Sequence, residues 1–379
     1  MIKLSDHLRS ESVNVDKLSA KAGVAPERMR ALAADAEPTL GELRRIASAL
    51  GIPMLDFAGA PSATDQQADL LFRKAIVAGK PVSPAAVSSL SRRMSRSFEL
   101  LRSSRQGGAP WWLSEFEHGD ETLQSAERNA SIFRKLFCND DQLSPLLSLP
   151  KIVIDRMEAM LFVVRSQDFD GASAFFDGVP FAFVSARFRG RMLFTLAHEC
   201  GHLVSHHNPE DSFAIIDEAI EDAPVADPKR ASSERYADAF ASALLMPSMS
   251  TGLTLKKVRE IAKITDNEIG DLEIGYLARI FGVSFWAAAR RCEDLSLLPR
   301  GGAAALNDRI AKEYGSAEKR GDEAGLPPRP EIDFPRVPWP LMASAVERVR
   351  AGELSVGRAA AIVGLSISDL MAANAPTEH

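Results

Sequence analysis

The stretch FTLAHECGHLVSHH, residues 194–207, has the periodicity of an amphipathic helix. Apolar side chains recur at i, i+3 and i+4 spacing from the residue before it, at Leu193, Leu196, Cys200, Leu203 and Val204. His198 and His202 fall on the opposite side, and Glu199 lies between the two faces. We therefore predict a helix that buries one side and turns two histidines toward a cleft.

His198, Glu199 and His202 form the pattern H-E-x-x-H. Residues four apart on a helix share a face, with Cβ atoms about 5–6 Å apart. Both imidazoles can then bind one zinc ion at about 2.0–2.1 Å. The intervening glutamate can act as a general base. The alternative is a histidine pair with ordinary partners, but the pattern is rare in a chain with 7 histidines, so we favour a catalytic zinc site.

The remaining residues of this stretch do not supply a third ligand by spacing. A three-histidine site needs glycine at 205 and histidine at 208, where the chain has Ser205 and Asn208. His206 and His207 come too early for that pattern, and we expect them to face solvent rather than line the cleft. Cys200 projects into the apolar stripe, so we expect a buried, inert thiol.

A carboxylate ligand is available in ASSERYADAFASALLMP, residues 231–247. Glu234 and Asp238 lie one helical turn apart, and Ala237 and Ala241 are small enough to let this helix approach the first closely. We expect Glu234 to be the third ligand and Asp238 to accept the free imidazole N–H of a ligand histidine. Other acidic residues remain as less favoured alternatives: Glu210, Asp211, Asp217, Glu218, Glu221 and Asp222.

The composition limits the class of protein. The 379 residues suffice for two or three domains, and the net charge of −6 argues against a chain dominated by nucleic-acid affinity. Three cysteines predict a reducing compartment without disulfides. The N-terminus lacks an apolar signal core, and the chain contains no run of 18 apolar residues. We expect a cytoplasmic protein without a membrane segment.

The pattern along the chain predicts an α+β, mostly helical fold. β-branched and aromatic runs between residues 150 and 187 predict a small antiparallel sheet that leads into the metal helix. Six prolines between residues 327 and 340 predict an extended linker or surface strap. The expected units are a helix-turn-helix domain (1–60), a helical connecting region (61–145), a zinc metallopeptidase domain (146–300), a proline-rich linker (301–340) and a C-terminal helical segment (341–379).

Residues 1–60 resemble the phage-repressor helix-turn-helix family through LSAKAGVAPERMRAL and TLGELRRIASALGI. Gly23 supplies the turn and Pro26 suits the first position of the next helix. That helix, residues 26–33, would present Glu27, Arg28 and Arg30 to a DNA major groove. The segment is not basic, with eight Lys/Arg and eight Asp/Glu. A helical interaction or dimerisation module, and with it a homodimer, is the alternative.

Two further features have structural explanations. Five arginines mark one helical stretch, and we interpret them as a solvated face rather than a phosphate-binding surface: Arg92, Arg93, Arg96, Arg102 and Arg105. Trp111 and Trp112 stand beside a proline and glycines, and we expect them to pack against a neighbouring domain.

Residues 150–300 resemble the ImmA/IrrE family of zinc metallopeptidases. The matching stretches are RMLFTLAHECGHLVSHH and ERYADAFASALLMP, supported by IGYLARIFGVSFWAAARRCEDL. The resemblance implies a gluzincin-like site with His198, His202 and Glu234 as zinc ligands, Glu199 as general base, and Asp238 behind a ligand. It also implies cleavage of a helix-turn-helix repressor that controls stress, phage or mobile-element genes.

Two functions follow. The first is a zinc endopeptidase, with an extended substrate paired to a strand edge near residues 180–188 and with Tyr236, His206 or His207 stabilising the oxyanion. The second is a DNA-binding transcriptional regulator whose metallopeptidase-like domain acts as a sensor or partner-binding module, with a toxin–antitoxin or defence role as a variant of it.

Overall fold

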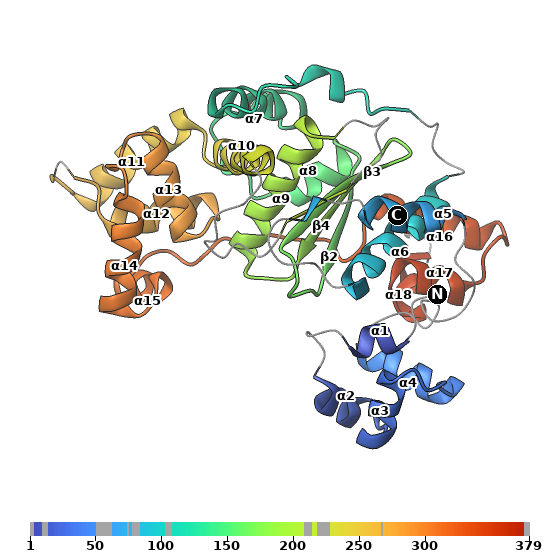
Figure 1. The fold of residues 1–379 in the computed structure, drawn as a ribbon. Helices are drawn as coiled ribbons and strands as arrows, with labels where there is room; N and C mark the ends of the chain where they lie inside the picture. Colours follow the sequence, from blue (N-terminus) through green and yellow to red (C-terminus); the bar gives the residue numbers. More distant parts are fainter. Residues whose placement is uncertain are drawn as a thin grey trace.

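The computed structural model describes residues 4–9, 14–50, 63–73, 76–77, 84–102, 108–207, 214–217, 228–266 and 268–374. Most of these residues are helical, and one small sheet lies near the centre of the molecule (Figure 1). The α+β, mostly helical fold predicted from the sequence is confirmed.

The sheet has the strand order β1-β5-β3-β4-β2. Its strands are β1 (Ile76–Val77), β2 (Met160–Val164), β3 (Gly171–Phe176), β4 (Val179–Ser185) and β5 (Ala214–Asp217). β3 and β4 form a hairpin in which Phe176 pairs with Val179 across Asp177 and Gly178. Both turn residues have positive φ, 49° and 75°, as a two-residue hairpin turn requires.

The sheet is mixed rather than purely antiparallel. β3 pairs antiparallel with β4, as expected, and also with β5, but β2 pairs parallel with β4 and β1 pairs parallel with β5. The expectation of a purely antiparallel sheet is wrong because β4 lies between β2 and β3, so β2 does not pair with the strand that follows it in sequence. β4 is consequently an interior strand, and the prediction of a free substrate-binding edge near residues 180–188 is wrong for Val179–Ser185.

Both faces of the sheet are covered. Along β4, Phe181 and Phe183 belong to one hydrophobic core and Ala182 and Val184 to another. This alternation explains why VPFAFVS is apolar at nearly every position, since each side chain alternately enters one of two cores.

Four helices cover the first face of the sheet, the one that carries Ala182 and Val184, and they include the helix predicted to bind metal. They are α7 (Leu123–Phe137), α8 (Leu149–Asp155), α9 (Arg189–Ser205) and α10 (Pro228–Leu245). α10 packs on both α9 and α7. The core continues into five further helices: α11 (Ser248–Ala262), α12 (Asp271–Phe281), α13 (Phe285–Asp294), α14 (Gly302–Tyr314) and α15 (Ala317–Glu323).

The second face, the one that carries Phe181 and Phe183, is covered by two segments that are far apart in sequence. They contain α5 (Ala63–Arg73) and α6 (Pro84–Leu101), and then α16 (Trp339–Arg350), α17 (Val356–Val363) and α18 (Ile367–Asn374). Ser344 Oγ donates to Leu100 O at 2.8 Å, and Arg348 Nη1 donates to Glu99 O at 3.0 Å. Figure 1 shows these blue and red helices side by side.

The proline-rich segment between α15 and α16 is not helical, as predicted. It lies over the first core and buries Ile332 and Phe334 in it. Trp112 is fully buried and donates from Nε1 to Met157 O at 3.0 Å, whereas Trp111 is 59% exposed. Of the two tryptophans expected to pack, only Trp112 is buried.

The arginine-bearing helix is only partly a solvated face. Arg92, Arg93 and Arg96 on α6 are half-buried, and the Arg93 guanidinium lies 5.4 Å from the centre of the Phe162 ring. Arg102 is exposed, and Arg105 lies outside the described residues.

The N-terminal helices have a small core of their own. They are α1 (Leu4–Leu8), α2 (Val15–Ala22), α3 (Pro26–Ala33) and α4 (Leu40–Leu50). Asn14 caps α2, and Gly23 ends it in the left-handed region with φ 61°. Pro26 occupies the first turn of α3, as expected.

Among the described helices, none alone has the length and hydropathy to cross a membrane. The pair α12 and α13 meets that criterion only when taken together across a bend of 108°.

Candidate metal centre

Three side chains predicted to bind metal converge in the structure. His198 and His202 extend from one face of α9, and Glu234 extends from α10. One potential ligand atom from each lies within 4.8 Å of the other two. His198 Nε2 lies 3.0 Å from His202 Nε2 and 3.3 Å from Glu234 Oε2, and His202 Nε2 lies 3.8 Å from Glu234 Oε1.

These separations fit a divalent metal. Ligands about 2.0–2.1 Å from a tetrahedral zinc ion are about 3.4 Å from each other. Asp238 Oδ1 accepts from His198 Nδ1 at 2.9 Å, which leaves Nε2 as the His198 atom available to a metal.

Glu234 is held as a carboxylate by its neighbours. Burial by itself raises the pKa of this carboxyl, but contacts with His198 and His202 outweigh burial and hold the pKa well below its ordinary value. An ionised carboxylate beside two imidazoles is the donor set of a catalytic zinc site.

A close approach of α9 and α10 brings the ligands together. A Cβ atom added at Gly201 would lie 3.2 Å from the Cα of Ala237. Ala237 and Ala241 are fully buried, as expected of small residues at this contact. The glycine and alanines therefore set the distance between the histidine helix and the glutamate helix.

Glu199 is fully buried at the junction of α9 and β3. A Cβ atom added at Gly171, the first residue of β3, would lie 1.9 Å from Glu199 Oε1 and 2.8 Å from the methyl carbon of Thr195. Only a glycine leaves room for the carboxylate. The sequence does not reveal this role, because the two residues meet only through the packing of β3 on α9.

His206 and His207 do not face solvent, contrary to expectation. His206 Nδ1 lies 2.9 Å from His202 Nδ1, and its Nε2 is buried. Burial and the neighbouring His202 lower the pKa of His206 to about 2, so this ring is neutral. His207 is 3% exposed, and its Nε2 lies 3.2 Å from Ser173 Oγ on β3. The expectation failed because β3 and α10 cover the C-terminal end of α9.

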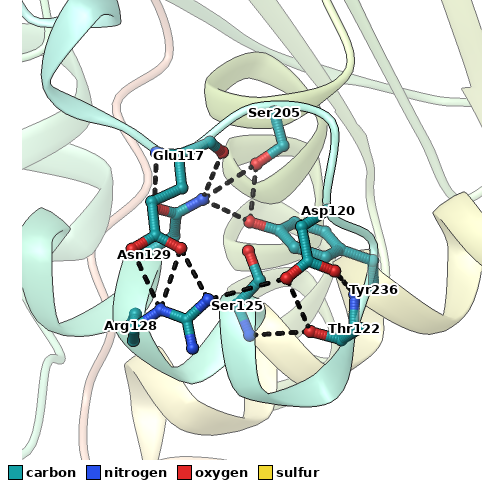
Figure 2. A network of polar contacts seen from close by, with 8 residues as sticks. All are labelled: Glu117, Asp120, Thr122, Ser125, Arg128, Asn129, Ser205 and Tyr236. Carbon is teal, nitrogen blue, oxygen red and sulfur yellow. Dashed lines mark hydrogen bonds and ion pairs between the residues drawn. The ribbon is translucent and has the colours of Figure 1, made fainter.

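Tyr236, considered for oxyanion stabilisation, uses its hydroxyl elsewhere. Figure 2 shows this hydroxyl in a polar network, where Ser205 Oγ and Asn129 Nδ2 each approach it at 2.6 Å. Asn129 also exchanges two hydrogen bonds of 2.9 Å with the backbone of Glu117. The network connects α7, α9 and α10, and so it fixes the two ligand-bearing helices relative to each other.

Cys200 is fully buried, and burial strongly raises the pKa of its thiol. The predicted burial of this side chain is confirmed. The alternative ligands Glu210, Asp211, Glu218, Glu221 and Asp222 lie outside the described residues, as does the side chain of Asp217.

The three proposed DNA-contacting residues lie on α3 in different settings. Glu27 and Arg30 are exposed, and Arg30 Nη2 lies 3.6 Å from Asp16 Oδ1. Arg28 donates to Glu42 at 2.8 and 3.0 Å and to Glu37 O at 2.8 Å. The Arg28 guanidinium is the main reason that the pKa of Glu42 falls to about 2. Arg28 therefore ties α3 to α4 in this structure.

Comparison with known proteins agrees with the geometry of the metal centre. No curated protein matches the chain. Residues 156–293 match the family model Peptidase_M78, the IrrE N-terminal-like domain. This segment contains both histidines, both carboxylates and Glu199, so the part of the chain that builds the candidate centre is similar to a peptidase domain.

Proposed function

We propose that this protein is a zinc-dependent endopeptidase. The observation that supports this best is the convergence of His198, His202 and Glu234 from two helices, with Asp238 bonded to the first ligand. Two imidazoles and one carboxylate are a recurrent ligand set of catalytic zinc, and they leave a coordination position open. A zinc ion held there would polarise a peptide carbonyl and make a water molecule more acidic.

In this proposal the protein side chains have distinct tasks. Glu199 takes the proton of the attacking water and transfers it to the leaving amine. Asp238 fixes the orientation and tautomer of His198. Gly171 leaves the space in which the Glu199 carboxylate lies.

We propose a helix-turn-helix transcriptional repressor as the substrate. The support is the resemblance of residues 150–300 to the ImmA/IrrE peptidases, which implies cleavage of a repressor of this kind. Cleavage would switch on stress, phage or mobile-element genes.

The test uses the zinc-loaded protein and a helix-turn-helix repressor encoded by any neighbouring gene, with and without DNA. Glu199→Gln is expected to bind zinc normally and to lose cleavage by at least about 100-fold. Glu115→Gln is the control, because Glu115 is an exposed carboxylate outside the metal centre. Normal cleavage by Glu199→Gln would overturn the proposal.

DNA binding by residues 1–60 is a second proposed function, favoured by the α2–Gly23–α3 arrangement on its own core. Arg30→Ala is expected to weaken binding to a selected DNA sequence while the protein stays folded, because Arg30 is exposed. Arg28→Ala is the contrasting variant, since it also removes the bridge to Glu42. A selection from random DNA that yields no preferred sequence would contradict this function.

A further inference from the structure

Each ligand histidine has its own partner behind it, and the two partners differ. His198 Nδ1 lies 2.9 Å from the carboxylate of Asp238, whereas His202 Nδ1 lies 2.9 Å from another imidazole, His206 Nδ1. His206 directly follows the last residue of α9 and lies four residues after His202, so both rings lie on the same side of the helix end. Their ring centres are 5.0 Å apart.

The tautomers of His202 and His206 follow from metal binding at His202. When His202 binds through Nε2, its proton lies on Nδ1, and His206 Nδ1 must accept it. His206 then carries its own proton on Nε2. That atom is buried, and Glu121 Oε1 lies 3.6 Å from it. A carboxylate at this distance favours an N–H on Nε2 over a lone pair, because opposite partial charges attract.

Glu121 belongs to a loop whose conformation is defined on both sides. Thr122 caps α7 by accepting from Ser125 N at 3.2 Å, and Asp120 accepts from the backbone and hydroxyl of Thr122 at 3.2 Å. Arg128 pairs with Glu117 at the start of the loop. Figure 2 shows this loop beside Ser205 and Tyr236, and the Tyr236 ring lies edge-on to His206.

We propose that His206 and Glu121 are positioning residues for His202, and that Glu121 supplies this support from outside the peptidase-like segment 156–293. The inference rests on the proposed zinc site. In order, His202 donates from Nδ1 to His206, and His206 directs its Nε2–H at Glu121. The chain holds the His202 ring in the plane and tautomer that the metal needs, as Asp238 does for His198.

The experiment measures the metal site itself, without substrate. Zn²⁺ affinity of the 379-residue protein is determined by competition with a chelator. The Co²⁺-loaded protein is then examined by proton NMR, where the imidazole N–H protons of the metal ligands give separate shifted signals. The variants are His206→Leu, His206→Gln and Glu121→Gln, with Asp238→Asn to assign the His198 signal and Glu115→Gln as the surface control.

His206→Leu is expected to weaken Zn²⁺ binding by about 10–100-fold and to speed solvent exchange of the His202 N–H, because that proton loses its acceptor. His206→Gln should recover part of both, since its amide oxygen can accept. Glu121→Gln should weaken binding by about threefold. It should speed exchange of the His202 signal while the His198 signal stays unchanged.

Equal behaviour of Glu121→Gln and Glu115→Gln in both measurements would overturn the role of Glu121. Glu121 lies on the surface, so a failure to fold will not obscure that result. Unchanged Zn²⁺ affinity in His206→Leu would overturn the positioning role of both His206 and Glu121. If the unsubstituted protein binds no divalent metal, both the proposed zinc site and the positioning role of His206 and Glu121 are wrong. If it binds metal but cleaves no protein, only the proposed peptidase function fails.

Discussion

The α carbon of Gly171 on β3 faces the carboxylate of Glu199 on α9, with no room for even one carbon atom between them. Gly171→Ala should therefore displace Glu199 while leaving the metal ligands in place. We expect cleavage to fall by at least about 100-fold with near-normal Zn²⁺ affinity, because catalysis depends on the position of the base. Loss of metal binding in this variant would show instead that β3 itself had moved. Gly252→Ala on α11 is the control, since nothing lies within 4 Å of a Cβ there.

Asp238 is exposed on one side but bonded to His198 on the other. Asp238→Asn should lower Zn²⁺ affinity by about 10–100-fold, because the neutral asparagine amide accepts the His198 N–H less strongly than the aspartate carboxylate does. Chelator competition measures this change. Asp322→Asn is a comparison on an exposed carboxylate of α15 and should bind zinc normally. Equal Zn²⁺ affinities in the two variants would show that Asp238 does not support metal binding.

Asn129 is fully buried at the centre of the network in Figure 2. Asn129→Leu should lower the free energy of unfolding by about 1–3 kcal/mol, because the Glu117 backbone and the Tyr236 hydroxyl lose buried hydrogen-bond partners. Chemical denaturation measures the loss. We also expect weaker zinc binding, since α9 and α10 both lose their hydrogen bonds to Asn129 on α7. Stability equal to that of the unsubstituted protein would contradict the importance of the network.

The three cysteines should react slowly in the folded protein. Burial raises the pKa of Cys138 to about 11 and of Cys292 to about 12, and it raises that of Cys200 further. At pH 8 the thiolate fraction is therefore very small, and it grows as the pH rises toward these values. Mass spectrometry after iodoacetamide treatment should find little labelling at pH 8 and full labelling in denaturant. Rapid labelling of Cys200 under native conditions would contradict its burial.

The C-terminal helices should stabilise the central sheet although they lie outside the peptidase-like segment. Leu341 on α16 is 1% exposed in the core that also contains Phe181 and Phe183. Leu341→Ala should cost about 2–5 kcal/mol in unfolding free energy. Met371→Ala, on the exposed side of α18, should cost less than about 0.5 kcal/mol. Similar losses in both variants would argue against this packing.

The sequence by itself was sufficient for much of the metal centre. H-E-x-x-H places two histidines on one helical face, and the Glu234–Asp238 spacing places two carboxylates on another, so local periodicity predicts both halves of the site. The spacing of His202 and His206 contains the same signal, and it could have identified His206 as a partner of His202. Spacing alone does not distinguish a hydrogen-bond partner from a ligand or from a ring that faces solvent.

Only the tertiary structure determined how these parts meet. The insertion of β4 between β2 and β3, the cover of the sheet by residues from both ends of the chain, and the contact of Gly171 with Glu199 all depend on pairing between distant segments. Periodicity reports which face of an element is apolar, but it does not report which element will cover that face. The sequence alone therefore determined which side chains are available to the candidate centre, while packing determined their separations, their burial and the residues that hold them.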